Sequence, residues 1–190
     1  DKYVYIGYLN TIVYAALHTL LMLALTTLVA YPLARKNYVG SKFTTIFLII
    51  TMFFNGGLIP TYLLMKDLDL IDTVWAMVIP GSISAYNVFI FRTFFRNIPY
   101  ELTESAYLDG AGDLRILLQI ILPLSLPLLA TFTLLSIVTV WNSWFNALIY
   151  LNEQEMYPLQ LILRNYLFVI DNNTLQQQAG VATSVNPLMT

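Results

Sequence analysis

Four long stretches without Asp, Glu, Lys or Arg constrain this chain more than any other feature of its sequence. They cover residues 3–34, 43–65, 73–91 and 116–152. A helix needs about 20 mainly apolar residues to cross a bilayer, and each stretch supplies that many or nearly so. Uninterrupted apolar runs exclude the alternating pattern of a membrane barrel, which leaves helices as the spanning structure. We therefore predict an all-α, polytopic helical membrane protein.

The composition supports this class and excludes several kinds of site. Only 11% of the residues are charged, 58% are hydrophobic and the mean hydropathy is +0.68, whereas soluble domains carry roughly 25% charged residues. The chain has no cysteine and a single histidine, so neither disulfides nor a metal cluster is expected. We predict that this histidine, His18, forms a hydrogen bond between helices rather than a proton relay.

The distribution of basic residues predicts which loops face the cytoplasm. Six of the nine Lys and Arg residues fall in two alternate loops: Arg35, Lys36, Lys42, Arg92, Arg96 and Arg115. The positive-inside rule assigns such loops to the cytoplasm. The acidic loop at residues 66–72 and the segment from residue 151 to 190 then lie outside, the latter with a short helix beginning near Pro158. Four complete spans are predicted, with Gly56-Gly57, Pro60 and Pro80-Gly81 as interruptions: residues 10–34, 43–65, 73–95 and 124–150.

The cytoplasmic stretch at residues 97–123 has the residues of a compact projecting loop. Pro99 suits the first turn of a helix, and Glu101 complements the positive end of its dipole. Gly110 and Gly112 are expected to end that helix. A second helix is predicted from about residue 114 to Pro123, where the last span begins.

This loop resembles the EAA loop of bacterial ABC importer permeases in every spacing. The matching residues are Glu104, Ser105, Ala106, Gly110, Ile120, Leu122 and Pro123, with Ser105 standing where the family usually has alanine. Segments 55–60, 71–76 and 141–146 resemble the carbohydrate, maltose-permease-like branch, and within it most closely the group that imports complex or acidic oligosaccharides. The likeness covers essentially the whole chain.

The resemblance implies a type I ABC importer permease fold, formed here by one domain over residues 1–190 that is truncated at both ends and holds four of six spans. It also implies that residues 97–123, called the coupling loop below, dock on a separate ATPase dimer. Carried over by position, the coupling residues are Glu104, Ser105, Ala106, Leu108, Asp109 and Gly110. Further implied partners are a second related permease subunit and an extracytoplasmic solute-binding protein, with the chain in the bacterial cytoplasmic membrane. No nucleic acid is expected.

Polar and aromatic residues inside the spans are candidates for the solute path. Sugars are held by aromatic stacking and amide hydrogen bonds, and polar groups within spans face protein or water. The candidates are Asn87, Trp141, Asn142, Trp144 and Asn146. Asn142 and Asn146 are expected one turn apart on one helix face. The alternative is that these asparagines join helices and the tryptophans lie at the membrane interface.

Two function classes compete at this point. An ATP-driven oligosaccharide importer subunit needs a partner to hydrolyse ATP, because the chain contains no Gly-x-x-x-x-Gly-Lys-Ser/Thr phosphate loop. No catalytic residue and no cofactor is therefore assigned to the chain, and ATP and Mg are expected on the partner ATPase. An ion-gradient-driven secondary transporter usually has Asp, Glu, Lys or Arg inside its spans, and none of these residues is central in any of the four runs.

Overall fold

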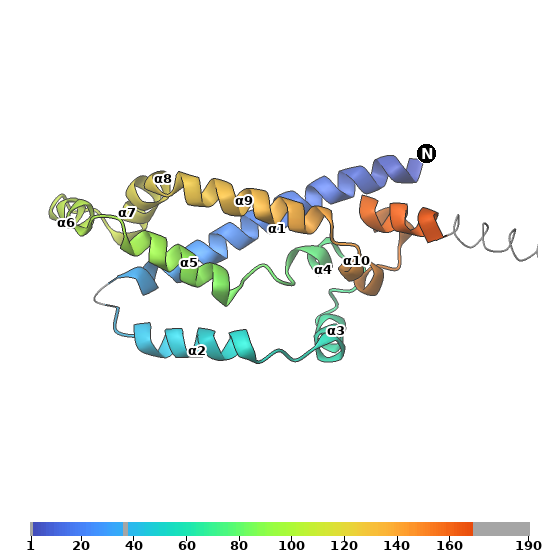
Figure 1. Cartoon of the computed structure of the whole chain (residues 1–190), viewed down its shortest axis with the longest axis horizontal. Helices are drawn as coiled ribbons and strands as arrows, with labels where there is room; N and C mark the ends of the chain where they lie inside the picture. Colours follow the sequence, from blue (N-terminus) through green and yellow to red (C-terminus); the bar gives the residue numbers. More distant parts are fainter. Residues whose placement is uncertain (1, 36–37, 169–190) are drawn as a thin grey trace, which may run out of the picture.

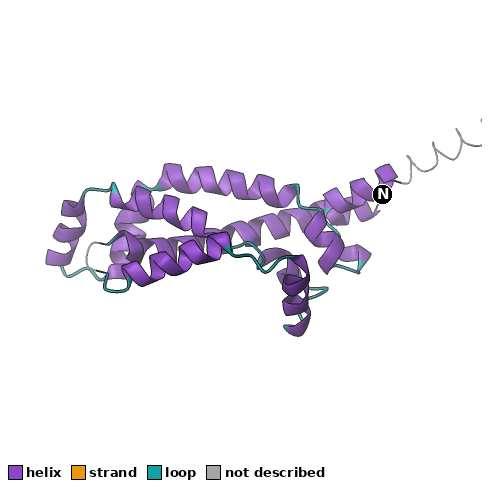
Figure 2. Ribbon diagram, turned by 60° about the horizontal axis from the view of Figure 1, so that its bottom comes forward, coloured by secondary structure: helices purple, strands orange, loops and turns teal. Residues whose placement is uncertain are grey.

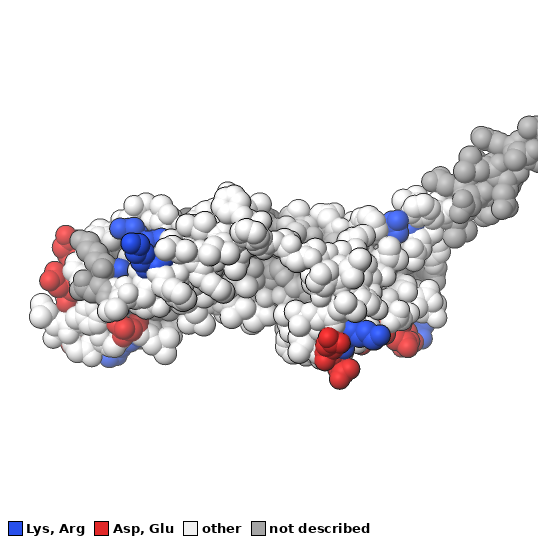
Figure 3. All heavy atoms as spheres, turned by 90° about the horizontal axis from the view of Figure 1, so that it is seen from below, with Lys and Arg blue, Asp and Glu red and all other residues white. Residues whose placement is uncertain are grey.

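The structure is a computed structural model that describes residues 2–35 and 38–168, and every regular element in those ranges is a helix (Figures 1 and 2). The all-α prediction is thus confirmed. The molecule is elongated, and on the face shown in Figure 3 the charged side chains gather near its two ends, leaving a middle without Lys, Arg, Asp or Glu. We call these the cytoplasmic end, which carries the coupling loop, and the external end, after the sides that the charge pattern predicts.

Helix α1 (Lys2–Ala34) is the longest element, and the others assemble on it. Its 33 residues reach about 50 Å, more than the hydrocarbon core of a bilayer. It packs along α5 (Ala85–Arg96) and α9 (Leu126–Trp141). Polar contacts join α1 to two helices: His18 Nδ1 donates to the Val78 carbonyl of the helix at residues 74–78 at 2.9 Å, and the hydroxyls of Thr19 and of Ser136 in α9 lie 2.8 Å apart. The role predicted for His18 is confirmed.

The predicted second span is not one continuous helix. It is divided into α2 (Ser41–Phe53) and α3 (Leu58–Asp67), which meet at 114°. Gly57 adopts φ +84° with ψ −178°, a conformation essentially restricted to glycine, and its N–H donates to Asn55 Oδ1 at 2.9 Å. These residues turn the chain so sharply that α3 leaves the direction of α2 (Figure 1).

The third predicted span is also divided. Helix α4 (Val74–Val78) is separated from α5 by residues 79–84, where Pro80 cannot donate a backbone hydrogen bond and Gly81 has φ +75°. By length and hydropathy α1 is the one described helix able to cross a membrane unaided. Two bent pairs add up to two more spans: α2 with α3, and residues 113–124 with α9.

The fourth predicted span ends earlier than expected. Helix α9 stops at Trp141, and after a break at residues 142–144 the short helix α10 (Phe145–Tyr150) follows. Asn142 ends α9, because its side-chain Nδ2 donates to the Val138 carbonyl at 2.8 Å. The expectation that Asn142 and Asn146 share one helix face is therefore wrong.

The external segment folds back onto the first half of α1. A 3₁₀ turn (Gln154–Met156) precedes a helix at residues 159–168, which confirms the short external helix; residues 169–190 of the predicted external segment lie outside the described residues. Asn10 Nδ2 donates to the Glu155 carbonyl at 2.7 Å, and Tyr14 donates to the Met156 carbonyl at 2.8 Å. Gly7 allows the close approach, since a Cβ there would lie 3.3 Å from the Leu159 backbone.

Buried apolar residues form one cluster at the cytoplasmic end and two at the external end. The cytoplasmic cluster is centred on Phe91 of α5, which is fully buried and has ring centroids of Phe95 and Phe132 at 5.9 and 5.0 Å. It includes residues of α1, of α9 and of the coupling loop. The loop is therefore packed onto the spans through a shared apolar core.

Candidate functional site

The first helix of the coupling loop, α6 (Tyr100–Leu108), begins and ends as its sequence predicts. Pro99 directly precedes it, with Glu101 in its first turn. At its other end Gly110 has φ +77°, the Gly110 N–H donates to the Tyr107 carbonyl at 3.0 Å, and the Ala111 N–H donates to the Ala106 carbonyl at 2.9 Å. This pair of bonds is a Schellman motif, which requires the left-handed residue that glycine supplies. Helix α6 lies at the tip of the cytoplasmic end (Figure 1).

The structure exposes five of the six predicted coupling residues and buries the sixth. Ala106 is 9% exposed and packs into the cytoplasmic core cluster, because the face of α6 that carries it turns toward the spans. It is therefore not a surface residue, although the resemblance carried it over as a coupling residue. The exposed residues are Glu104, Ser105, Leu108, Asp109 and Gly110. Leu108 is 85% exposed, an apolar group presented outward at the tip of the molecule.

The second half of the loop differs from the single helix predicted there. Gly112 is the residue before α7 (Asp113–Ile116) rather than part of the end of α6. A π-helical turn, η1 (Leu117–Ile121), and the short α8 (Leu122–Leu124) follow, and the chain bends by 79° before α9. Ser125 at this bend is fully buried and its hydroxyl donates to the Ile121 carbonyl at 2.7 Å.

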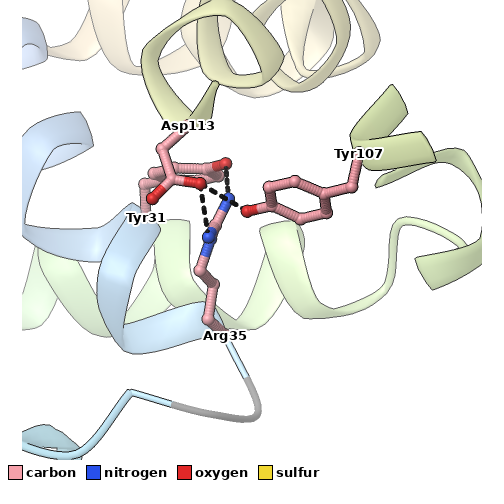
Figure 4. Close-up of polar contacts among 4 residues, drawn as sticks. All are labelled: Tyr31, Arg35, Tyr107 and Asp113. Atoms are coloured by element: carbon pink, nitrogen blue, oxygen red, sulfur yellow. Dashed lines mark hydrogen bonds and ion pairs between the residues drawn. The ribbon is translucent and has the colours of Figure 1, made fainter. Parts of the chain in front are cut away.

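A cluster of four side chains ties the coupling loop to the end of α1 (Figure 4). Arg35 lies 2.7 Å from Asp113 Oδ1 in an ion pair and also donates to the Tyr31 hydroxyl. Its guanidinium carbon lies 4.7 Å from the Tyr31 ring centroid and 5.3 Å from that of Tyr107. Tyr107 of α6 donates to the same Asp113 oxygen. One arginine after the first span therefore holds both halves of the loop.

The contacts within this cluster shift the pKa values of the two coupling-loop members, Asp113 and Tyr107. The hydrogen bond from Tyr107, followed by the contacts with Arg35, lowers the pKa of Asp113, so the carboxylate is favoured. Desolvation, with the hydrogen bond to Asp113, raises the pKa of Tyr107 to about 12. Sequence analysis assigned Arg35 only a role in topology. Its partner lies far along the chain, and no local pattern identifies such a pair.

A cavity of about 280 Å³ lies beside this cluster. It separates α6 from the ends of α1 and α5, and its lining is aromatic and apolar with two guanidinium groups: Tyr31, Ala34, Arg35, Phe95, Arg96, Ile98, Tyr100, Thr103, Tyr107 and Ile121. Helix α6 thus touches the spans through the Arg35 cluster and the Ala106 side, with free volume between them.

The structure brings four of the five predicted path residues together at the external break. Trp141 packs edge-on against Tyr8 of α1 at 5.7 Å between ring centroids, and Trp144 packs against Phe145 at 5.6 Å. Asn142 and Asn146 flank the break and are both exposed. Asn87 comes from a different element, α5, where it is half-buried.

Two residues that sequence analysis did not select adjoin this group. Gln160 Nε2 donates to Asn142 Oδ1 at 3.4 Å, and the guanidinium carbon of Arg164 lies 3.9 Å from the centroid of a Trp144 ring. The only available signal was that Arg164 is the single basic residue of the predicted external segment. Within residues 2–35 and 38–168, no group of three His, Cys, Asp or Glu residues could hold a metal ion.

A hydrogen-bonded turn stabilises the external end next to this group. Asp72 has φ +57°, and its carboxylate accepts the Asn152 backbone N–H and the Asn152 side-chain Nδ2, the latter at 2.6 Å. The backbone hydrogen bond from Asn152 is the largest cause that lowers the pKa of Asp72. The loop before α4 is thereby joined to the segment after α10.

Known proteins share this architecture and much of the sequence. The chain is 40% identical over 166 residues to the polygalacturonan/rhamnogalacturonan transport system permease protein YtcP of Bacillus subtilis (strain 168), covering 87% of this chain and 58% of that protein. It is 42% identical over 153 residues to Protein LplC of the same organism, covering 80% of this chain and 52% of that protein.

A solved structure is also similar: the crystal structure of a bacterial ABC transporter involved in the import of the acidic polysaccharide alginate. The TM-score is 0.84 at 36% identity, with 87% of this chain and 59% of that chain covered. The present chain thus spans somewhat more than half the length of these relatives. The resemblance to ABC importer permeases predicted from the coupling loop, and that to their carbohydrate branch predicted from segments 55–60, 71–76 and 141–146, are confirmed. A family model described as "Binding-protein-dependent transport system inner membrane component" matches residues 4–182, and the chain belongs to that family.

Proposed function

We propose that this chain is the transmembrane subunit of an ATP-driven importer that moves oligosaccharides, including uronate-containing ones, across the bacterial cytoplasmic membrane. The single observation that carries the proposal is the form of α6, a capped helix at the cytoplasmic tip with Glu104, Leu108 and Asp109 exposed. A surface that combines an exposed leucine with acids is suited to a protein partner. The full importer comprises more than the part of the relatives that this chain spans.

The coupling loop receives motion in this proposal and does not generate it. ATP and Mg are bound by a separate ATPase dimer, and its closure displaces α6. The Arg35–Asp113 ion pair and the shared apolar core then carry that displacement to α1, α5 and α9. Helices α1, α5 and α9 share the packed core around Phe91 and move together, because such a core has little free volume. Helix α6 acts on them through its contacts on either side of the cavity.

The remaining partners follow from the family to which the chain belongs. A second related permease subunit completes the path in a heterodimer, and a solute-binding protein delivers the oligosaccharide to the external end. The exposed apolar side chains of α2 are available for lipid or for the second subunit, since none of its residues is buried. Substrate specificity for acidic glycans is supported by the relatives' names and by the residues around Trp144.

Family membership favours this function over an ion-gradient-driven secondary transporter. The Asp, Glu, Lys and Arg residues of the described chain lie near its two ends (Figure 3), and His18 within α1 is engaged by the Val78 carbonyl. A carrier that couples to an ion gradient typically has charged or titratable groups in the middle of the membrane.

The test is co-purification of the chain, in the full-length transporter, with its ATPase. Glu104→Lys and Gly110→Pro should each reduce ATPase binding and solute-stimulated hydrolysis at least severalfold, because they change the exposed surface and the end of α6. Glu153→Lys makes the same charge change at the external end and should leave ATPase binding unchanged. Retention of the ATPase and of stimulated hydrolysis in both α6 variants would refute the assignment.

A further inference from the structure

Arg164 is held between two aromatic rings at the external end. Its guanidinium carbon lies 3.9 Å from the centroid of a Trp144 ring and 4.6 Å from that of Phe168, and the side chain is half-buried. A guanidinium group is planar and stacks on aromatic faces, which it attracts through cation–π interactions. Contacts on its faces orient the group and leave its edge free.

The edge of this guanidinium group is where hydrogen bonds form, and it has no acceptor within the described part of the chain. An arginine has five N–H donors, all of which lie in its plane. Arg35 bonds to Asp113 and Tyr31, and Arg92 bonds to the Leu33 carbonyl and Thr45. For Arg164 the contacts among residues 2–35 and 38–168 are the two ring contacts alone.

The acidic residue Asp72 at this end is already hydrogen-bonded within the fold. Asp72 accepts three hydrogen bonds from Asn152 and Glu153, and its carboxylate is therefore used within the fold. No acidic side chain of the described residues lies within ion-pair distance of Arg164. A positive charge that is oriented but not neutralised favours an external anion.

Two side-chain amides, those of Gln160 and Asn142, belong to the same group of residues as Arg164 and Trp144. Gln160 lies one helical turn before Arg164 and therefore on the same face, and its side chain contacts Asn142, which is exposed beside Trp144. Stacking surface, amides and an oriented guanidinium edge match the three chemical parts of a uronate sugar: its ring face, its hydroxyls and its carboxylate. Bidentate pairing of arginine with a carboxylate is among the stronger hydrogen-bonded contacts in proteins.

We infer that Arg164, stacked on Trp144, binds the carboxylate of a uronate residue at the external entrance of the solute path and thereby selects acidic over neutral oligosaccharides. This assignment rests on the proposed importer function. The helix that carries Arg164 is fixed in place by α1, since the Leu159 N–H donates to Thr11 Oγ1 at 2.9 Å and Ile162 is buried. The guanidinium group is therefore held before ligand arrives, which reduces the entropy lost on binding.

The experiment compares two solutes of the same shape with the complete transporter in proteoliposomes. Trigalacturonate carries the carboxylates, and its fully methyl-esterified form does not. For Arg164→Gln we expect kcat/KM for trigalacturonate to fall about 10- to 100-fold, as expected for loss of a charged hydrogen-bonded contact, with uptake of the ester within about twofold of wild type. Arg164→Lys keeps the positive charge but lacks the planar set of N–H donors that pairs with both carboxylate oxygens. The fall in kcat/KM for trigalacturonate should therefore be intermediate. Lys66→Gln, which removes another cation at the external end, should leave both solutes unaffected.

The outcomes separate the inference from the function on which it rests. An equal loss for both solutes in Arg164→Gln overturns the inference, because it indicates a packing role for Arg164, and so does unchanged uptake of both. Wild-type transporter that imports neither solute, and whose ATPase neither stimulates, would instead refute the proposed function. Co-purification of the ATPase with Arg164→Gln establishes that the variant assembles.

Discussion

Arg35 and Arg164 lie at opposite ends of the molecule, and both guanidinium groups rest against aromatic rings. At the cytoplasmic end the edge of Arg35 is taken up by Asp113 and by the Tyr31 hydroxyl. At the external end the edge of Arg164 has no protein acceptor among the described residues. The Arg35 guanidinium group therefore joins parts of the fold, whereas the Arg164 guanidinium group has N–H donors available for a ligand. What differs is whether a carboxylate of the fold lies within reach.

The two ends also differ in how their helices are held. The external helix at residues 159–168 depends on close approach to Gly7, whereas α6 depends on the Arg35 cluster and on the left-handed Gly110. Variants at these positions should therefore loosen one end and leave the other unchanged. Hydrogen exchange of peptides from each end, measured in the assembled transporter, reports the two local opening free energies separately.

The largest effect is expected from Gly7→Val. A Cβ at this position lies 2.5 Å from Ile162 Cδ1 and 3.3 Å from the Leu159 backbone, and such overpacking costs about 3 kcal/mol. Exchange should rise in residues 159–168 and not in α6. Gly56→Val is the control, because its Cβ has only Pro60 Cβ at 3.6 Å. Equal effects of the two variants would contradict the close packing at Gly7.

Arg35→Ala should have the next largest effect, at the cytoplasmic end. It removes a charged hydrogen bond and ring contacts that are only partly screened by solvent, for a local cost of about 2 kcal/mol. Exchange should rise in α6 and α7, and solute-stimulated ATPase activity should fall. Asp113→Asn should be less costly alone and should add little to Arg35→Ala, because both remove the same pair. Full additivity of the two changes would mean that the pair does not act as a unit.

Gly110→Ala should cost less, about 1 kcal/mol, the strain of an L side chain in the left-handed region. Gly112→Ala is a matched control two residues away, because neither Cβ meets an atom within 4 Å and Gly112 has φ −76°. Exchange at the end of α6 should therefore rise in the first variant alone. A similar increase in both would assign the effect to loop composition rather than to the Schellman motif.

The smallest effect concerns pH. The pKa values of Asp72 and Asp113 are lowered, so their contributions are complete above the ordinary carboxylate pKa of about 4 and are lost as the pH falls through the lowered values. Tyr107, with its pKa raised to about 12, contributes fully below about pH 10 and loses this contribution as the pH rises toward 12. The differences in melting temperature between wild type and Asp72→Asn or Asp113→Asn should shrink toward pH 3. A difference in melting temperature that grows as the pH falls would mean that the pKa values of these carboxyl groups are raised rather than lowered.

Local residue chemistry predicted the features that depend on neighbours in sequence. Pro99 and Gly110 were sufficient to predict α6, and Gly56-Gly57 and Pro80-Gly81 to predict interruptions. The break at residues 142–144 was missed because the uncharged run continues through it, although Asn142 and Ser143 are polar. The Asn142 side chain bonds to its own helix at the end of α9. The π turn likewise has no distinct local sequence signal. The bend at Ser125 does have one that was not used, because Pro123 and Pro127 flank it and neither can donate a backbone hydrogen bond.

Long-range pairs could not be predicted from one sequence. The sequence alone does not indicate which face of α6 packs against the spans, and Ala106 lies on that face. Arg35 with Asp113, and Arg164 with Trp144, join residues whose meeting depends on the packing of several helices. The charge pattern assigned Arg35 and Asp113 to one end and Arg164 to the other, and the structure separates them in the same way, but the pattern gave no information on their partners.

The length of α1 has a consequence for how the protein is made. A ribosome completes this helix before any other described element, and α1 is the one described helix that can cross the bilayer unaided. Later segments with short or broken helices then enter a membrane in which His18 and Thr19 already offer hydrogen-bonding partners to Val78 and Ser136. Helix α1 is thus a template for biogenesis, and its polar residues act as docking points for helices too short to insert stably by themselves.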